Sequence, residues 1–149
     1  MKKLLVSALV IGFLLSFGAF GVIAVDQDIN ATIDDNLTIS ISPATVEFGA
    51  VSAGSSGNPA SSGNISFDPA GSNVNVNVDV TNVTGKPFEG GLKFDGSLAQ
   101  GQDYDILCVG NPCTYTPKTV SPTLDVPIGS RAGIKTGTIT YIITGTPPA

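Results

Sequence analysis

The chain has 149 residues, with seven basic and twelve acidic side chains, a net charge of −5 and no histidine. This length suits one ordinary domain. An acidic surface repels nucleic acid and anionic lipid, so we expect neither as a partner of the folded domain.

The first 24 residues have the pattern of a secretory signal. Lys2 and Lys3 precede an uncharged apolar run from Leu4 to about Val25, with a small-residue cleavage site at Ala24. Cleavage there leaves 125 residues, with five basic and twelve acidic side chains and a net charge of −7. The apolar run is also long enough to cross a bilayer as a helix, so an uncleaved membrane anchor stays open. In both cases we expect an exported protein, extracellular or on the cell surface, which meets the membrane only if this hydrophobic signal helix is retained.

Residues 25–35 form an extension that already has the pattern of a strand. Its apolar side chains alternate with polar ones, and the candidates for burial are Val25, Ile29, Ala31 and Ile33. Chain termini are commonly frayed and unpatterned, so the alternation calls for a partner. Two readings stay open: an edge strand of its own domain, folded back at Asp34-Asp35-Asn36, or a donor strand that completes the sheet of a neighbouring copy. Ten extended residues reach about 33 Å, enough to cross a small β-sandwich.

Residues 36–146 read as a series of short strands, followed by a tail at 147–149. Apolar residues recur at every second position, clusters of Gly, Pro, Asn and Asp separate the runs, and no helical periodicity is found. We expect strands within residues 37–42, 45–51, 65–69, 72–85, 91–96, 104–109, 114–120, 123–128 and 136–144, and a flexible loop at 52–64. This spacing predicts an all-β fold: a single antiparallel β-sandwich, with immunoglobulin-like and jelly-roll topologies both open.

The most regular of these strands is residues 72–85. Val74, Val76, Val78 and Val80 alternate with Asn75, Asn77, Asp79 and Thr81. We expect the opposite sheet to cover the valines, because a slip of one residue would bury the asparagines and the aspartate instead. In the last strand, Ile139, Tyr141 and Ile143 share a face in the same way.

The two cysteines are Cys108 and Cys113, with Val-Gly-Asn-Pro between them. Outside the cell an even pair is usually a disulfide, and the intervening residues suit a turn. A redox pair normally has two intervening residues, and a metal site needs further soft ligands. We therefore predict a structural disulfide.

Four Asn-x-Ser/Thr triplets make the chain a candidate glycoprotein. Their acceptor residues are Asn30, Asn36, Asn64 and Asn82. They are usable if the protein is exported by an organism that has the machinery.

Nothing in the sequence indicates catalysis, a metal or a cofactor. Histidine is absent, and the chain has no Gly-x-Ser-x-Gly nucleophile motif. Three acidic runs, at residues 26–28, 34–36 and 103–105, lack the full loop pattern of a calcium site, so we expect solvated turns there. We expect a protein that is not an enzyme.

Three segments resemble the strands of exported immunoglobulin-like domains: TVEFGAVSAGSS, VNVDVTNVTGKPFE and AGIKTGTITYIIT. The resemblance covers residues 37–145 and implies the fold, although the cysteine pair and tryptophan of immunoglobulin domains are missing. In organisation, with a signal, a patterned N-terminal strand, one sandwich and sequons, the chain is similar to TasA-type biofilm fibre subunits and archaeal bundling pilins. That similarity implies a secreted structural protein of filaments, biofilm or the cell surface, which self-associates head-to-tail by β-strand addition into a homopolymer.

Two other functions stay open. One is a monomeric, membrane-anchored surface or adhesion domain. The other is a carbohydrate-binding module, which usually presents an aromatic platform. The lack of tryptophan disfavours the module, since only Tyr104, Tyr115 and Tyr141 could add to the phenylalanines of such a surface.

Overall fold

The computed structural model describes Ala31 and residues 33–149. The chain divides into two units, Met1–Ile33 and Asp34–Ala149. The predicted signal helix at 1–24 and the candidates Val25, Ile29 and Asn30 lie outside the described residues. Of the first unit only Ala31 and Ile33 are described, and both are exposed.

The second unit is mostly β, as the alternation predicts. In chain order its elements are β1 (Ser40–Ser42), β2 (Asn58–Pro59), β3 (Ile65–Asp68), β4 (Asn75–Thr84), α2 (Phe88–Gly91), β5 (Leu92–Phe94), β6 (Ser97–Leu98), β7 (Asp103–Ile106), β8 (Lys118–Val120), β9 (Pro122–Leu124) and β10 (Thr138–Thr146). The short helix α2 has non-helical backbone angles at Glu89 and Gly90, so it behaves as a tight connection between β4 and β5.

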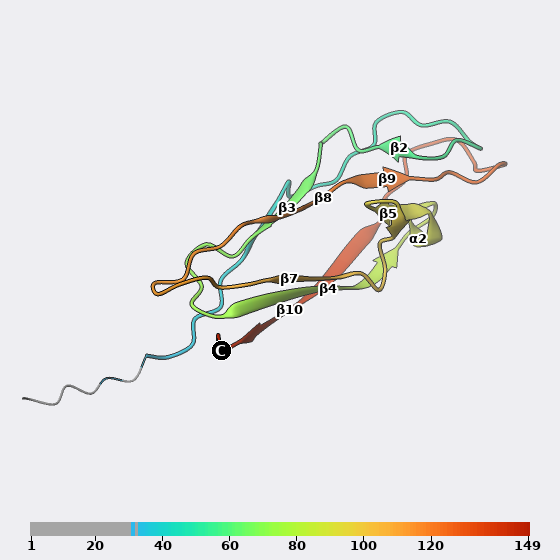
Figure 1. Cartoon of the computed structure of the whole chain (residues 1–149). Helices are drawn as coiled ribbons and strands as arrows, with labels where there is room; N and C mark the ends of the chain where they lie inside the picture. Colours follow the sequence, from blue (N-terminus) through green and yellow to red (C-terminus); the bar gives the residue numbers. More distant parts are fainter. Residues whose placement is uncertain (1–30, 32) are drawn as a thin grey trace, which may run out of the picture. The chain divides into compact units, whose positions relative to one another are not determined.

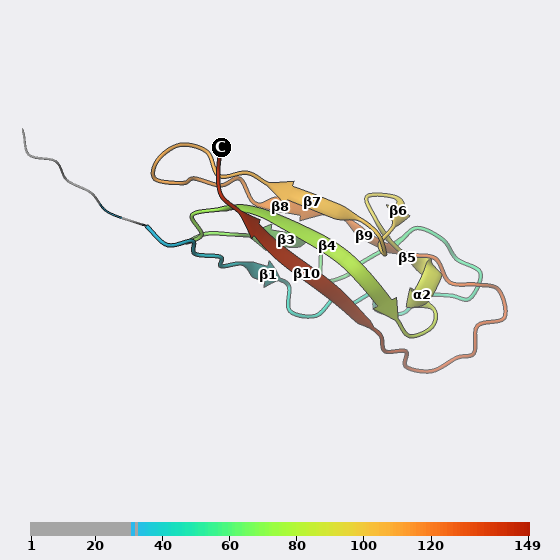
Figure 2. The ribbon, with the colours of Figure 1, turned by 90° about the horizontal axis from the view of Figure 1, so that it is seen from below.

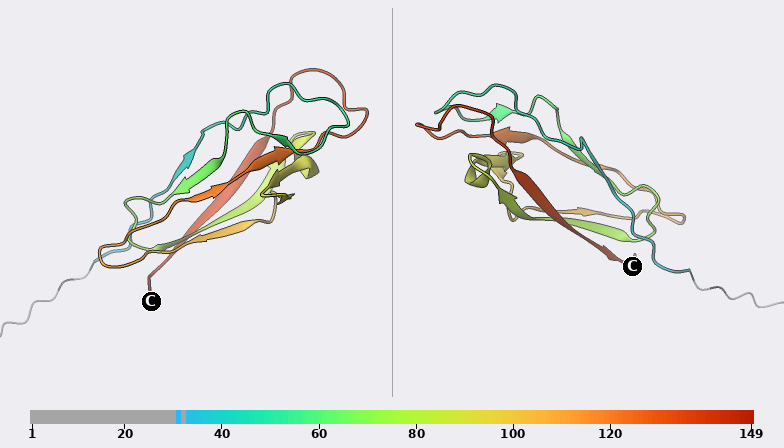
Figure 3. Two further views of the ribbon diagram at one scale, coloured as in Figure 1. Left: turned by 45° about the horizontal axis from the view of Figure 1, so that its top comes forward. Right: turned by 180° about the vertical axis from the view of Figure 1, so that it is seen from behind.

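The strands form three antiparallel sheets, with the orders β1-β3-β8, β10-β4-β7 and β2-β9-β5-β6. Figure 1 shows β3, β8 and β9 following one another in one layer, which faces β4, β7 and β10 in the other. The two further views in Figure 3 show the same two layers. Phe67 of β3 bridges them, because its ring lies 5.7 Å from that of Tyr104 on β7 and 5.5 Å from that of Tyr141 on β10.

The central strand β4 confirms the predicted burial pattern. Val74, Val76, Val78 and Val80 are at most 2% exposed, whereas the intervening Asn75, Asn77 and Asp79 are half-buried. β4 lies between β10 and β7, so both of its edges are paired and its valine face covers the middle of the core. Burying one such valine contributes about 1.5 kcal/mol or more, which fixes the register of the whole strand.

Two local predictions are wrong. Residues 45–51 form no strand, although Val46 and Phe48 still pack against the core. Their main chain is held from one side only, by Ser61, whose N–H donates to the Glu47 carbonyl at 2.6 Å, and by the Ser62 hydroxyl. The loop at 52–64 contains β2, because Asn58 pairs with Leu124 of β9 and its side chain donates to the Leu124 carbonyl at 2.7 Å.

Candidate functional site: a groove between two edge strands

A groove of about 1050 Å³ opens along one side of the second unit. Its lining comes mainly from residues 43–51, which follow the edge strand β1, and from residues 130–139, which lead into and begin β10, the edge strand of another sheet. Figure 2 shows these two strands along the same side of the unit. The groove is largely apolar; its apolar lining includes Ile41, Val46, Phe48, Phe88, Ile139 and Tyr141.

The burial of β10 differs from that of its neighbour β4. In the ladder between them, Ile139 faces Val83, Tyr141 faces Val80 and Ile143 faces Val78. The three β4 valines are 4%, 0% and 0% exposed, but the three β10 side chains on the same inward face are only partly buried. The core is therefore closed under β4 and left open under β10.

β10 is also a long edge without the usual protection. It has nine residues, Thr138–Thr146, and none is charged or proline. Its only irregularity is a register shift between Thr140 and Tyr141. Proteins commonly protect exposed edges with charges, proline or short strands, because an unpaired row of N–H and C=O groups can accept another strand.

One end of the groove depends on the absence of a side chain at Gly137. A Cβ atom at this position would overlap the Thr84 carbonyl and lie 2.6 Å from the ring of Phe88. Phe88 in turn lies 6.3 Å, between ring centroids, from Phe48 on the facing segment. Glycine at 137 thus lets β10 begin tightly against the end of β4, with the two aromatic rings forming one end of the groove.

Among the groups that line the groove, the phenol of Tyr141 has a raised pKa. Burial, with a smaller effect of Tyr104, raises the pKa of Tyr141 to about 12, so its hydroxyl stays protonated in the groove. Below the groove, Lys93 and Asp125 form an ion pair at 2.6 Å. The hydrogen bond from Lys93, followed by one from the Gly57 N–H, lowers the pKa of the Asp125 carboxyl.

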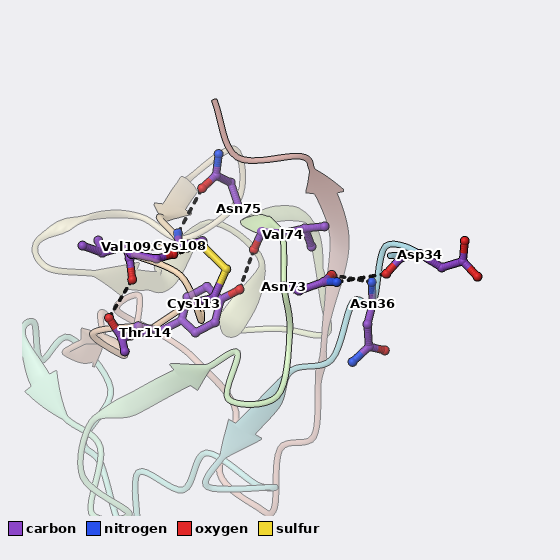
Figure 4. Close-up of a disulfide and its surroundings, with 11 residues drawn as sticks. Asp34, Asn36, Asn73, Val74, Asn75, Cys108, Val109, Cys113 and Thr114 are labelled. Atoms are coloured by element: carbon purple, nitrogen blue, oxygen red, sulfur yellow. Dashed lines mark hydrogen bonds between the residues drawn. A yellow bond between two sulfur atoms is a disulfide. The ribbon is translucent and has the colours of Figure 1, made fainter. Parts of the chain in front are cut away.

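The chain enters the second unit through a set of side-chain hydrogen bonds that we name the N-terminal clasp, residues 34–38 with residues 71–73. The Asn73 side chain accepts the Asn36 N–H at 2.6 Å and donates to the Asp34 carbonyl at 2.9 Å (Figure 4). The buried Ser72 hydroxyl accepts the Thr38 N–H at 2.7 Å and donates to the Thr38 carbonyl at 2.6 Å. These bonds replace the strand that the sequence predicts to begin at residue 37, and they tie residues 34–38 to residues 71–73.

Cys108 and Cys113 form the predicted disulfide. It closes a hairpin whose Val109 and Thr114 exchange main-chain hydrogen bonds at 3.0 and 2.9 Å. The hairpin is tied to the start of β4, because the Cys108 N–H donates to the Asn75 side chain at 3.0 Å and the Tyr115 hydroxyl donates to the Val74 carbonyl at 2.8 Å (Figure 4). Residues 73–75 therefore hold both the N-terminal clasp and the disulfide hairpin.

The candidate glycosylation residues differ in what their side chains do. Asn36 is exposed, but its side-chain amide donates to the Gly71 carbonyl at 2.7 Å within the clasp. Asn64 is exposed and its side-chain oxygen accepts the Ser121 hydroxyl at 3.0 Å, so its amide nitrogen can be approached. Asn82 is exposed on β4, opposite Thr140 of β10. Of the donor-strand candidates, Ala31 and Ile33 are exposed, and Ile33 is exposed to 82%.

Within residues 31 and 33–149, no group of three His, Cys, Asp or Glu side chains could hold a metal ion. In the same part of the chain, no helix has the length and apolar character that crossing a membrane requires. The acidic runs at 34–35 and 103–105 are exposed at their aspartates, and Asp105 accepts a hydrogen bond from the Asn77 side chain at 2.9 Å.

Comparisons of the chain with protein-family models, with curated proteins and with solved structures found no match. The unpaired edge of β10 lies beside the apolar side chains that line the groove. An extended segment whose side chains alternate between apolar and polar has the matching properties.

Sequence reasoning missed several residues that shape this site. Phe88 follows the turn-forming Pro87, and Gly137 lies in a segment that the sequence predicts as a strand, so only their contact across the fold gives them a role at the groove. Asn73 lies just before the alternating run, and no local pattern assigns its side chain to a segment 37 residues earlier in the chain. The position of Ile139 and Tyr141 on one face was predicted, but their incomplete cover could not be.

Proposed function

We propose that this chain is a secreted, non-catalytic structural subunit. Its domain is an immunoglobulin-like sandwich that lacks one edge strand, and residues 25–33 of a neighbouring copy supply that strand. Repeated head-to-tail, this contact forms an extracellular filament or a cell-surface polymer. The observation that carries the proposal is the partial exposure of Ile139, Tyr141 and Ile143 beside the buried valines of β4.

The strand order supports the immunoglobulin-like topology over the jelly roll. Immunoglobulin domains have strands A, B and E in one sheet and, in the variable type, C′, C, F and G in the other. The order β1-β3-β8 matches A-B-E, and the order β7-β4-β10 matches C′-C-F. The position beyond β10, where strand G would lie, is unpaired, and the groove reaches it along Thr138, Ile139 and Tyr141.

The N-terminal extension has the length and pattern of the missing strand. Residues 25–33 number nine, as many as β10, and would extend over about 30 Å. Side chains at 25, 29, 31 and 33 are apolar and would face the groove together with Gln27, while Asp26, Asp28, Asn30 and Thr32 would face solvent. Such an added strand gains main-chain hydrogen bonds along β10 and buries its alternate side chains.

A neighbouring copy is favoured over the chain's own extension. Folding back would need a turn at residues 34–36. In the described part of the chain these residues form no turn, and the clasp holds them extended along Gly71 to Asn73. We therefore assign the added strand to a neighbouring copy.

The test compares the mature chain, beginning at Val25, with a variant that lacks residues 25–33. We expect the mature chain to form filaments in electron micrographs, and the truncated chain to be a folded monomer by circular dichroism and size-exclusion chromatography. A second variant, Ile29→Asp with Ile33→Asp, should lose assembly, whereas the matched polar-face variant Asn30→Ser with Thr32→Ser should retain it. Long filaments from the truncated chain would refute the proposal, and so would a mature chain that stays monomeric at high concentration.

A further inference from the structure

The loop between β9 and β10 carries an unusual group of exposed side chains. We name residues 127–137 the basic loop. Ile128 and Ile134 are exposed to 92% and 96%, and Arg131 and Lys135 are exposed beside them. Within the described part of the chain, neither Arg131 nor Lys135 forms an ion pair.

These two charges stand at the groove described above. Residues 130–137 all line it, together with the start of β10. Among the other basic residues of the second unit, Lys93 is paired with Asp125, Lys118 lies 5.4 Å from the ring centroid of Tyr104, and Lys86 is exposed next to Pro87, which lines the groove. The acidic side chains nearest to this region are Glu47, which also lines the groove, and Glu89 of α2.

The opposite end of the second unit is acidic. Figure 1 shows the start of the unit, in blue, at the end away from the loop that joins β9 to β10. Asp34 and Asp35 lie there and are exposed. The clasp uses the main-chain carbonyl of Asp34, and Figure 4 shows its carboxylate pointing away from the clasp.

We propose that, in the polymer, Arg131 and Lys135 of one copy bind the Asp34 and Asp35 carboxylates of the next, and that the added strand runs antiparallel to β10. This inference rests on the proposed function, since it identifies the partner of the basic loop as a second copy of this chain. A copy that joins head-to-tail places its acidic end against the basic end of its neighbour. Its residues 25–33 then lie along β10, with residue 33 beside the basic loop and residue 25 nearest the other end of the strand.

The direction of β10 gives the strand polarity. β10 begins at Thr138, directly after the basic loop, and ends near the clasp, where Gly145 lies against Val74 and Leu37. A strand that enters at the basic loop with its C-terminal end therefore runs antiparallel to β10, as strand G does beside strand F. A folded-back extension of the same chain would run parallel to β10 and keep Asp34 and Asp35 far from the basic loop.

Exposed ion pairs of this kind add little affinity each, but they steer association and exclude wrong orientations. Assembly should therefore be fastest at low salt and slow down as ionic strength shortens the screening length. Reversing both charges of one partner places like charges at the junction, which should raise the critical concentration at least about tenfold.

The experiment uses the mature chain with two charge reversals. One variant is Arg131→Glu with Lys135→Glu, and the other is Asp34→Lys with Asp35→Lys. Each alone should assemble poorly, whereas an equimolar mixture, or one chain carrying all four changes, should recover filaments. The two reversals shift the net charge in opposite directions, so an effect of net charge alone cannot weaken both. All four residues are exposed, and unchanged thermal unfolding would show that the fold is retained.

The outcomes separate this inference from the proposed function. If residues 25–33 are needed for assembly but each reversal leaves the critical concentration within twofold, the inference is wrong and the function stands. If the chain lacking residues 25–33 still polymerises, both are wrong. If the unmodified chain binds vesicles of anionic lipid, and the Arg131→Glu, Lys135→Glu variant loses that binding without losing assembly, the basic loop serves a lipid surface and the inference is overturned.

Discussion

The open side of the core predicts that two substitutions will have opposite effects on the domain and on the polymer. Val78→Ala removes two methyl groups from a side chain that is 0% exposed. At about 0.8 kcal/mol for each buried carbon, plus a cavity that the neighbours fill only in part, it should destabilise the domain by about 2 kcal/mol. Ile139→Ala removes three carbons, but its side chain is only partly buried and faces the groove, so the expected loss is about 1 kcal/mol.

In the polymer, Ile139→Ala should have the larger effect of the two substitutions. The added strand would cover the part of the Ile139 side chain that is exposed in the isolated domain. The free energy of burying that part would then stabilise the junction between two copies. Ile139→Ala should therefore weaken each junction by about 1 kcal/mol, which raises the critical concentration about fivefold. Val78 is already covered by its own domain, so Val78→Ala should leave the critical concentration within about twofold.

Two assays measure these quantities. Urea denaturation of the chain lacking residues 25–33 gives the free energy of unfolding of the isolated domain, and sedimentation of the mature chain gives the critical concentration. The reasoning fails if Ile139→Ala destabilises the isolated domain as much as Val78→Ala does and leaves the critical concentration unchanged. In that case, no strand from another copy covers the side of β10 that faces the groove.

Three further perturbations test other parts of the structure. Replacing both Cys108 and Cys113 by serine should lower the free energy of unfolding by about 2 kcal/mol, because a short loop is no longer closed in the unfolded chain; equal denaturation midpoints for the two forms would contradict this. Asn73→Ala should cost about 1 kcal/mol and speed amide exchange at residue 36, whose N–H it leaves without a partner, and undiminished protection there would show that the clasp is not needed. Burial raises the pKa of Tyr104 and Tyr141 from 10.0 to about 12, so their contribution to stability is intact below pH 10 and is lost as the pH rises towards 12. Phenolate absorbance should therefore rise together with unfolding in that range, and titration of all tyrosines near pH 10 in a folded protein would refute it.

The agreement between sequence and structure is best where one local pattern has one physical solution. In residues 74–81, which lead into and form most of β4, four valines alternate with polar residues, and only one register keeps the polar side chains out of the core. The disulfide was equally predictable, because two cysteines with only four residues between them allow a single pairing within the chain.

Agreement fails where pairing depends on distant parts of the chain. Residues 45–51 have the composition of a strand but form none, because the Glu47 main chain meets Ser61 and Ser62 through isolated hydrogen bonds and no continuous ladder. The Gly- and Ser-rich run at 52–64 was expected to be flexible. It is held instead by Asn58, which pairs with β9 more than 60 residues later, and by the Gly57 N–H, which donates to Asp125.

The sequence by itself determined that apolar and polar residues alternate along residues 36–146, that the two cysteines join, and that residues 25–33 carry a similar alternation. These are local properties, since side-chain direction in a strand repeats every two residues. Only the tertiary structure decided that β1 and β10 are both edges, that the core is closed under β4 and open under β10, and that Arg131 and Lys135 lie at the end of the unit away from Asp34 and Asp35. Which strand becomes an edge depends on how distant segments pair, and no single stretch of the chain carries that information.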